Sequence, residues 1–163
     1  MVMNFDRLSS NIIAIIGEVL KNQTLVNYLG WNGDDPSTQK INPALVAPKG
    51  STERIFPYPF DTTFKDDVRT QLHIYYPQLR FENNGNAGKA AILFDIVVHK
   101  DIWLLTDNGE KVIRPYQIMK LILNAFKDKQ VDGLGEIHFV SGEHTVVNEQ
   151  FEGFRLVATT TEF

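Results

Sequence analysis

Residues 85–90, Gly-Asn-Ala-Gly-Lys-Ala, come nearest to a phosphate-binding loop in this sequence. In that motif four residues separate the glycines, a Ser or Thr after the Lys holds magnesium, and a helix begins directly behind the loop. Here only two residues separate Gly85 from Gly88, and Ala90 follows Lys89. Strand-like patterns flank the segment on both sides. We therefore interpret it as the tip of a β-hairpin and not as a nucleotide site.

Imidazole side chains are the next candidates for chemistry, as metal ligands or general bases. The chain has His73, His99, His138 and His144. A catalytic zinc site needs three protein ligands with supporting partners. His138 and His144 have the same parity and would share a face of one continuous strand, with Glu143 on the opposite face. We predict exposed or hydrogen-bonded strand histidines, with no metal site, catalytic residue or cofactor.

Patterns for nucleophilic and acid–base catalysis are also sparse. The sequence has no Gly-x-Ser-x-Gly elbow and no cysteine. A tight turn explains residues 141–144, Ser-Gly-Glu-His. The acidic pairs at 34–35 and 66–67 are adjacent, so their side chains diverge in an extended chain and form no dyad. The chain is predicted not to be an enzyme, although scattered residues can still assemble an active site.

Composition limits the protein class. A length of 163 residues fits a single domain, residues 1–163, and 43% hydrophobic with 22% charged residues is ordinary for a globular chain. A net charge of −4 argues against a general nucleic-acid binder. Zero cysteines exclude disulfides and thiolate metal sites and are consistent with a reducing cytoplasm. The longest apolar run near the start, residues 12–16, is too short to span a bilayer, so we expect no signal peptide and no membrane segment.

Two amphipathic helices must carry much of the core. An apolar stripe at three- and four-residue spacing predicts a helix over residues 5–21. The stripe consists of Leu8, Ile12, Ile15, Ile16, Val19 and Leu20. Residues 23–29 are expected to add a short helix closed by Gly30 at its C′ position. Pro115 begins the second long helix, to about residue 129, with Lys127 and Lys129 in the last turn.

Strands account for most of the remainder. Residues 70–81 and 90–105 form an antiparallel hairpin with a tip at 82–89, and Pro77 indicates an edge or a bulge. After a turn at 107–109, residues 111–114 return briefly as a strand, and strands at 135–141 and 153–163 end the chain. Adjacent strands lack crossover helices. We therefore predict an α+β fold, with an antiparallel sheet and the two main helices packed on one face.

Residues 31–65 form a long irregular loop with several turn signals. Either the loop hides short strands, around residues 54–60, or it is an arm that becomes ordered against another molecule. Its aromatic residues lie among prolines and resemble interface anchors, or they cover the edge of the chain's own core. If the loop is an arm, deleting residues 36–52 should weaken oligomerisation and leave a folded monomer.

The layout as a whole resembles a known family. An N-terminal helix (residues 8–20) precedes a long excursion, a hairpin follows at 72–105, and Arg-Pro-Tyr at 114–116 introduces the second helix. The chain closes with Phe-Glu-Gly-Phe-Arg-Leu-Val-Ala at 151–158. This order, over most of the chain, resembles tail-terminator and tail-completion (neck) proteins of long-tailed bacteriophages and the related head–tail connector subunits. The resemblance is one of layout and not of a diagnostic motif.

The resemblance implies a structural virion protein, assembled in the bacterial cytoplasm, that forms a ring at the phage neck. The ring, a homohexamer in that family, would terminate the tail tube and join it to the head, with DNA passing through without sequence-specific binding. Its partners would be other copies, the tail-tube protein and head-completion or connector proteins. Candidate subunit-interface residues are Trp31, Phe56, Tyr58, Phe60, Asn84, Asn86, Thr160 and Phe163.

Two other functions stay open at this point. One is a small enzyme or ligand-binding α+β domain with a pocket under the long loop, which a monomeric mass in solution would favour. The other is an accessory protein of a different contractile or secretion apparatus, which neighbouring genes would identify.

Overall fold

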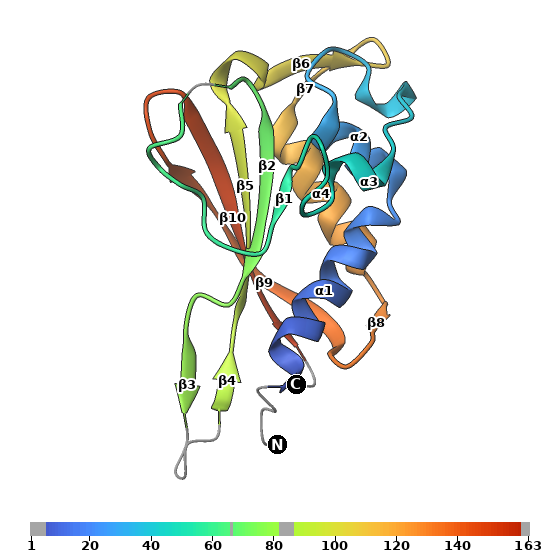
Figure 1. The fold of residues 1–163 in the computed structure, drawn as a ribbon. Coiled ribbons are helices and arrows are strands. Elements are labelled where there is room, and N and C mark those ends of the chain that lie inside the picture. The colour runs from blue at the N-terminus through green and yellow to red at the C-terminus, as the bar shows by residue number, and fades with distance from the viewer. Residues whose placement is uncertain (1–5, 66, 82–86, 161–163) are drawn as a thin grey trace.

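The computed structural model describes residues 6–65, 67–81 and 87–160. A six-stranded sheet forms its centre, with helices on one face (Figure 1). In spatial order the strands are β1 (Ile55–Phe56), β2 (Thr70–Tyr75), β5 (Ile92–His99), β10 (Phe151–Thr160), β9 (Gly135–Val146) and β8 (Gln130–Val131). The α+β prediction is confirmed. The sheet is mixed, however, because β1 runs parallel to β2 while all other neighbours are antiparallel.

Helices α1 (Asp6–Leu20), α2 (Gln23–Gly30) and α4 (Arg114–Phe126) lie on one side of the sheet (Figure 1). The 5–21 and 23–29 predictions are confirmed. Gly30 is the last residue of α2 and not its C′ residue, because the extended Trp31 caps the helix. A Cβ on Gly30 would lie 2.9 Å from Ile41 Cγ2, so this glycine permits close packing of the segment that follows.

The end of α4 differs from the prediction. The helix stops at Phe126, since Lys127 is extended and Asp128 has a positive φ of 54°. Lys127 and Lys129 therefore lie beyond the last turn and do not offset the helix dipole from within it. The Lys129 ammonium instead lies 2.5 Å from a carboxylate oxygen of Glu18 on α1, which joins the ends of the two helices.

Both long predicted strands are interrupted. The 70–81 strand breaks at Pro77, after which β3 (Leu79–Phe81) pairs with β4 (Ala87–Ala90). The 90–105 strand ends at His99 and continues through a 3-10 turn, η2 (Lys100–Ile102), into β6 (Leu104–Asp107). β6 pairs with β7 (Glu110–Ile113) across Asn108 and Gly109, both with positive φ as a type I′ turn requires.

β9 is longer than predicted and contains a bulge. It runs to Val146, and its pairing with β10 shifts between Val157 and Ala158, which leaves Val140 as the extra residue. His144 pairs with Phe154 while His138 pairs with Thr159. Since Phe154 and Thr159 differ in parity, the two histidines point to opposite faces. The expectation that they share a face is wrong because the bulge reverses the alternation.

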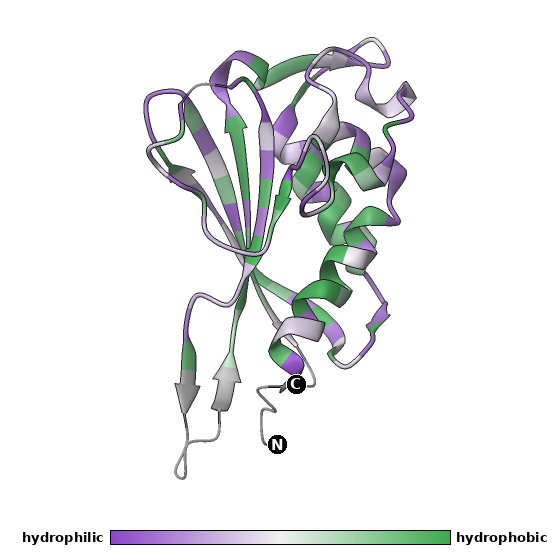
Figure 2. Ribbon diagram, viewed as in Figure 1, coloured by the Kyte–Doolittle hydropathy of each residue, from purple (hydrophilic) through white to green (hydrophobic). Residues whose placement is uncertain are grey.

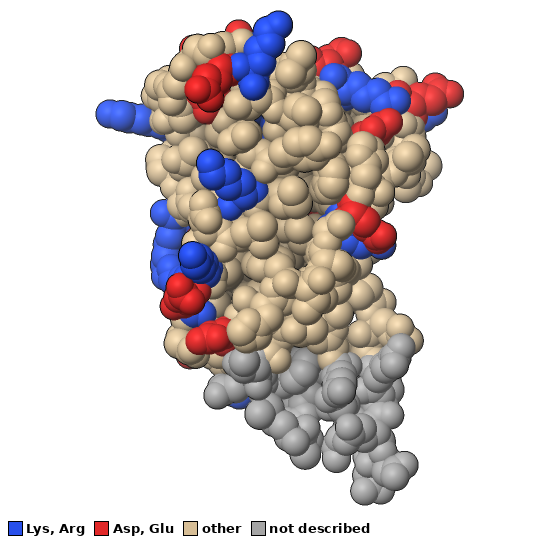
Figure 3. Space-filling model, turned by 180° about the vertical axis from the view of Figure 1, so that it is seen from behind, with Lys and Arg blue, Asp and Glu red and all other residues tan. Residues whose placement is uncertain are grey.

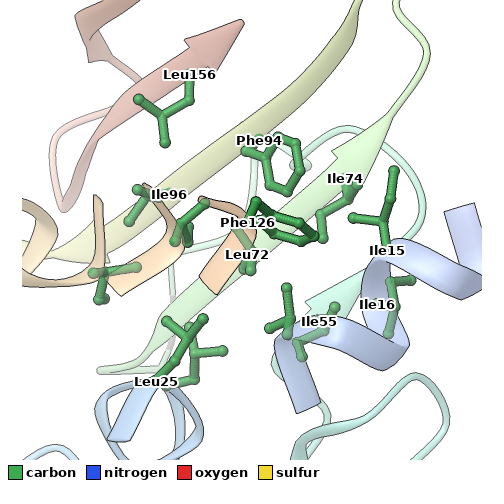
Figure 4. Packing of buried hydrophobic residues seen from close by; sticks show 14 of the residues in the cluster. Ile15, Ile16, Leu25, Ile55, Leu72, Ile74, Phe94, Ile96, Phe126 and Leu156 are labelled. Atoms are coloured by element: carbon green, nitrogen blue, oxygen red, sulfur yellow. The ribbon is translucent and has the colours of Figure 1, made fainter. Parts of the chain in front are cut away.

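The core lies between the sheet and the helices. In Figure 4, Ile15 of α1 and Phe126 of α4 point toward Phe94, Ile74 and Leu72 of the sheet. The Phe94 and Phe126 rings meet edge to face with centroids 5.7 Å apart. Figure 2 shows runs of hydrophobic residues in the helices beside the sheet, and those of α1 and α4 contribute to the buried core cluster. The predicted stripes thus bury their apolar faces as expected from the 3.6-residue period.

Residues 31–65 are folded onto the domain. They contain a 3-10 turn, η1 (Pro36–Thr38), a short helix, α3 (Pro43–Val46), and β1, in the region where a short strand was predicted. Val46 and Ile55 are fully buried. The Asp35 amide donates to the Thr106 carbonyl on β6 at 2.8 Å. These contacts show a segment that packs on its own chain at several points along its length.

Among the described residues, no helix combines the length and the apolar character needed to cross a bilayer.

Candidate docking surface

β1 ends the sheet on one side, and the Arg54 amide that precedes it donates to the Val46 carbonyl of α3 at 3.0 Å. The Leu72 amide on β2 donates to the Arg54 carbonyl at 2.8 Å, and residues 57–65 and 67–69 run over the face that carries no helix. Phe56 stacks on His73 with centroids 4.9 Å apart, and Phe60 contacts Phe151 at 5.3 Å. These aromatic rings therefore cover the chain's own sheet, which is the second of the two roles that the sequence left open for them.

His73 is buried in the middle of this aromatic layer. Its Nδ1 lies 2.6 Å from the Tyr58 carbonyl and its Nε2 lies 2.9 Å from the Gln71 side-chain amide. Burial lowers the pKa of His73 to about 4, against the opposing effects of the Tyr58 carbonyl and the charge of Asp95. The Gln71 atom at Nε2 is the amide oxygen, so the neutral ring, which carries one N–H, donates to one of these two oxygens at a time. His73 is therefore neutral at neutral pH. It anchors the loop and does not act as a general acid.

This pKa predicts a specific pH dependence of stability. Because the folded pKa lies below the unfolded value of about 6.5, the contribution of His73 is complete above pH 6.5 and is lost as pH falls toward 4. The difference in unfolding free energy between wild type and His73→Gln should shrink by up to about 3 kcal/mol over that range. Urea unfolding at pH 7.0, 5.5 and 4.5 measures it. A constant difference would show that His73 titrates normally in the folded chain.

A polar network lies beside this layer on the helix-free face. Asp95 on β5 accepts from Arg155 Nε on β10 at 2.8 Å and from the Tyr75 hydroxyl on β2 at 2.6 Å. Burial and the bond to Asp95 raise the pKa of Tyr75 to about 12, and the Asp95 carboxylate raises the pKa of Arg155. The three groups link three neighbouring strands. Each of the three side chains is hydrogen-bonded to another of them, so the network fits a structural role.

The opposite edge of the sheet is open. Within the described part of the chain, β8 pairs with Gly135 and Glu136 of β9 alone. Beyond the bulge, Ser141–Val146 pairs with β10 on one side, and no described strand pairs with its other side. In an antiparallel strand, alternate residues direct their N–H and C=O groups outward. The segment 141–146, hereafter the β9 edge, therefore offers backbone hydrogen bonds to a further strand.

Apolar side chains surround the β9 edge. Val146 at its end is 80% exposed and the bulged Val140 is 61% exposed. The neighbouring surface of α4 adds Tyr116, whose ring meets Phe154 at 5.1 Å, whereas the exposed Leu123 lies beside Ile137 and Phe139 on the other side of the bulge. Natural proteins usually protect an edge with charge, a bulge or a covering loop. Here the bulge interrupts the strand at Val140, and beyond it the segment carries one charged residue, the exposed Glu143, and ends in the exposed Val146.

A second feature available for docking is the β3–β4 hairpin. Figure 1 shows it extending beyond the sheet from the ends of β2 and β5. β3 and β4 pack against each other and make at most marginal contact with the other described elements. An isolated two-stranded hairpin is marginally stable in water. Its position therefore favours contact with another molecule.

An apolar groove lies under the long loop, where the alternative prediction placed a pocket. It has a volume of about 600 Å³ and lies between α1, the proline-containing turns and the end of β2. Ile13 on α1, 68% exposed, and Tyr58, 52% exposed, border it. The Tyr76 hydroxyl in its wall accepts a hydrogen bond from Asn11 at 3.3 Å. The groove has few polar groups with which to orient a small ligand.

The predicted interface residues are not brought together. Trp31 is partly exposed and its indole N–H donates to the Asp34 carbonyl at 2.8 Å, whereas Phe56 and Phe60 pack on the sheet. Tyr58 is exposed beside the groove, and Thr160 ends β10. Asn84, Asn86 and Phe163 lie outside the described residues. Their proposed interface role stays a prediction.

Sequence reasoning missed the β9 edge itself. Gly142 was interpreted as part of a turn, although it lies within the strand, where a Cβ would be 3.1 Å from Leu156. The sequence does carry a signal for a strand here, because Ser141, Glu143 and Thr145 place polar residues at every second position. No group of three or more His, Asp or Glu side chains in the described ranges is placed to hold a metal ion.

A family model described as YomW, a phage-derived family, matches residues 22–160. No curated protein matches the chain. The family match extends from α2 to the last residue of β10, and so includes the β9 edge and the β3–β4 hairpin. The chain therefore belongs to the YomW family and is a phage-related protein.

Proposed function

We propose that this protein is a structural subunit of a phage particle, which forms a ring at the neck, terminates the tail tube and joins tail to head. Membership of a phage-derived family supports the setting. The layout of elements supports the role of tail terminator or connector, with six copies as the expected number. Its partners would be other copies, the tail-tube protein and head-completion proteins.

The observation that carries this proposal is the open β9 edge with its apolar surroundings. A strand from another copy would satisfy the outward N–H and C=O groups and would cover Val140 and Val146. Exposed apolar residues beside an unpaired strand are an aggregation hazard in a monomer. In a closed ring the same surface is buried at every junction. Self-association therefore explains a feature that a monomer would be expected to protect.

The charge distribution supports passive passage of DNA. On the face shown in Figure 3, Lys and Arg side chains are interspersed with Asp and Glu, and no continuous basic patch is visible among the described residues. The net charge is −4. Non-specific DNA binding depends on neutralising several phosphates with a cluster of cations. A mixed surface of this kind suits a channel wall along which DNA moves without sticking.

The proposal is tested by blocking the edge. The double variant V140K/V146K places two lysines beside the β9 edge at exposed positions, so the fold should be retained. We expect light scattering to give a multi-copy mass for wild type and a monomer mass for the variant. Val68→Lys, also at an exposed valine but outside the edge, is the matched control and should still assemble. A wild-type chain that stays monomeric up to millimolar concentration would overturn the proposal.

The groove supports a second candidate function, a ligand-binding domain. Its volume of about 600 Å³ is within the range of small-molecule sites, roughly 300–1,000 Å³. A monomer at all concentrations, in which Ile13→Asp abolishes binding of a hydrophobic dye, would favour this candidate. A ring with an unaffected mass on the same substitution would favour the structural role.

A further inference from the structure

The β9 edge and the β3–β4 hairpin lie on different sides of the molecule. In the strand order, β9 is next to one end of the sheet, whereas the hairpin continues β2 and β5 near the other. Figure 1 shows the hairpin extending away from the sheet in continuation of β2 and β5. Two distinct surfaces that complement each other make a head-to-tail contact, and a contact of that kind generates a ring when the rotation between copies closes.

We propose, on the basis of the ring function above, that the β3–β4 hairpin of one copy adds to the β9 edge of the next. The occupant of the edge is thus a second copy of this chain, and the contact is strand addition. β4 has four residues, and the β9 edge, residues 141–146, is long enough to pair with a strand of that length. Each copy offers one hairpin and one edge, so every junction uses both.

The alternative pairing of one β9 edge with another fits the structure less well. Such a contact is two-fold symmetric and closes at two copies. It would leave both hairpins extended without a packing partner, although a two-stranded hairpin gains most of its stability from a third strand or a supporting surface. Addition of the hairpin to the edge gives both elements what they lack: the hairpin acquires a third strand and the edge acquires its missing neighbour.

The closing experiment mixes two variants of the full-length chain. The edge variant is V140K/V146K, and the hairpin variant has residues 79–90 replaced by a short glycine-containing turn. Each is expected to be a monomer by light scattering coupled to size-exclusion chromatography, with an unchanged circular dichroism melting transition as evidence of folding. An equimolar mixture is expected to give a two-chain complex and nothing larger, because one intact edge and one intact hairpin form a single junction.

Other outcomes separate the junction from the ring. A hairpin variant that assembles as wild type does would overturn the junction and leave the ring function standing. A mixture that contains only monomers would also overturn it. A hairpin variant that forms dimers by itself would identify edge-to-edge pairing instead. A wild-type chain that remains a monomer would overturn the ring, and the junction with it.

Discussion

Replacing Arg114 by methionine is expected to lower the free energy of unfolding by about 3 kcal/mol or more, because buried carbonyl groups lose a charged donor. Arg114 is fully buried at the start of α4. Its Nε donates to the Ile102 carbonyl at 2.9 Å, and its Nη1 donates to the carbonyls of Tyr28 and Trp31 at 3.1 and 2.9 Å. One side chain therefore holds together η2, the end of α2 and the beginning of residues 31–65.

The setting of Arg114 explains why a neutral residue cannot replace it. Nη2 donates to the carbonyls of Asn32 and Gly33 at 3.1 and 3.4 Å, just after α2, where carbonyl groups lack helical partners. Burial lowers the pKa of Arg114 to about 10, yet the side chain stays protonated at neutral pH. The positive charge also interacts favourably with the C-terminal end of the α2 dipole.

Urea unfolding at pH 7 measures the effect of Arg114→Met. Lys120→Met is the matched control, since Lys120 is exposed on the same helix and should change stability by less than about 0.5 kcal/mol. Arg114→Lys keeps the charge but loses the planar fork of donors, so it should recover only a small part of the loss. Equal stability of the methionine variant and wild type would show that water replaces the guanidinium without cost.

The elements that sequence could predict are those with local signals. The α1 stripe around Ile15 and Ile16 and the turn at Asn108-Gly109 depend on spacing and turn chemistry, and both were predicted correctly. The burial of Arg114 was not predictable, because arginine is usually exposed and its five carbonyl partners come from segments distant in sequence. The burial of Arg114 is determined by these tertiary contacts and not by its local sequence.

The candidate site was only partly predictable for the same reason. The hairpin was expected from two strand patterns on either side of an Asn/Gly-rich segment. The openness of the β9 edge depends on which strand lies beside it, and the sequence does not carry that information locally. The sequence left two roles open for the aromatic residues of the long loop, and Phe56 and Phe60 take the second, because they pack on the chain's own sheet through His73 and Phe151. Aromatic composition alone does not identify the surface that it covers.

The contacts of residues 36–52 reverse the expectation that their loss leaves a folded monomer. Replacing them by a Gly-Ser linker of equal length is expected to remove roughly 5 kcal/mol of stability, a large share of the 5–15 kcal/mol typical of a domain. The replacement removes the buried Val46 and exposes the part of the core that its side chain covers. It also changes the surroundings of the buried Asn27, whose amide now donates to the Gln39 carbonyl at 2.7 Å and accepts from the Ile41 amide at 3.0 Å.

Thermal unfolding followed by circular dichroism checks this expectation, with the 79–90 hairpin variant as the comparison. The hairpin makes marginal contact with the rest of the described chain, so its loss should leave the melting temperature nearly unchanged while abolishing assembly. The linker variant should instead melt at a much lower temperature or show no cooperative transition. If the linker variant melts like wild type and has lost only assembly, residues 36–52 are the docking arm. The opposite result, in which the linker variant loses stability and the hairpin variant melts like wild type without assembling, identifies the hairpin as the docking element. A segment that carries core residues is held on its own chain and is not free to bind a neighbour.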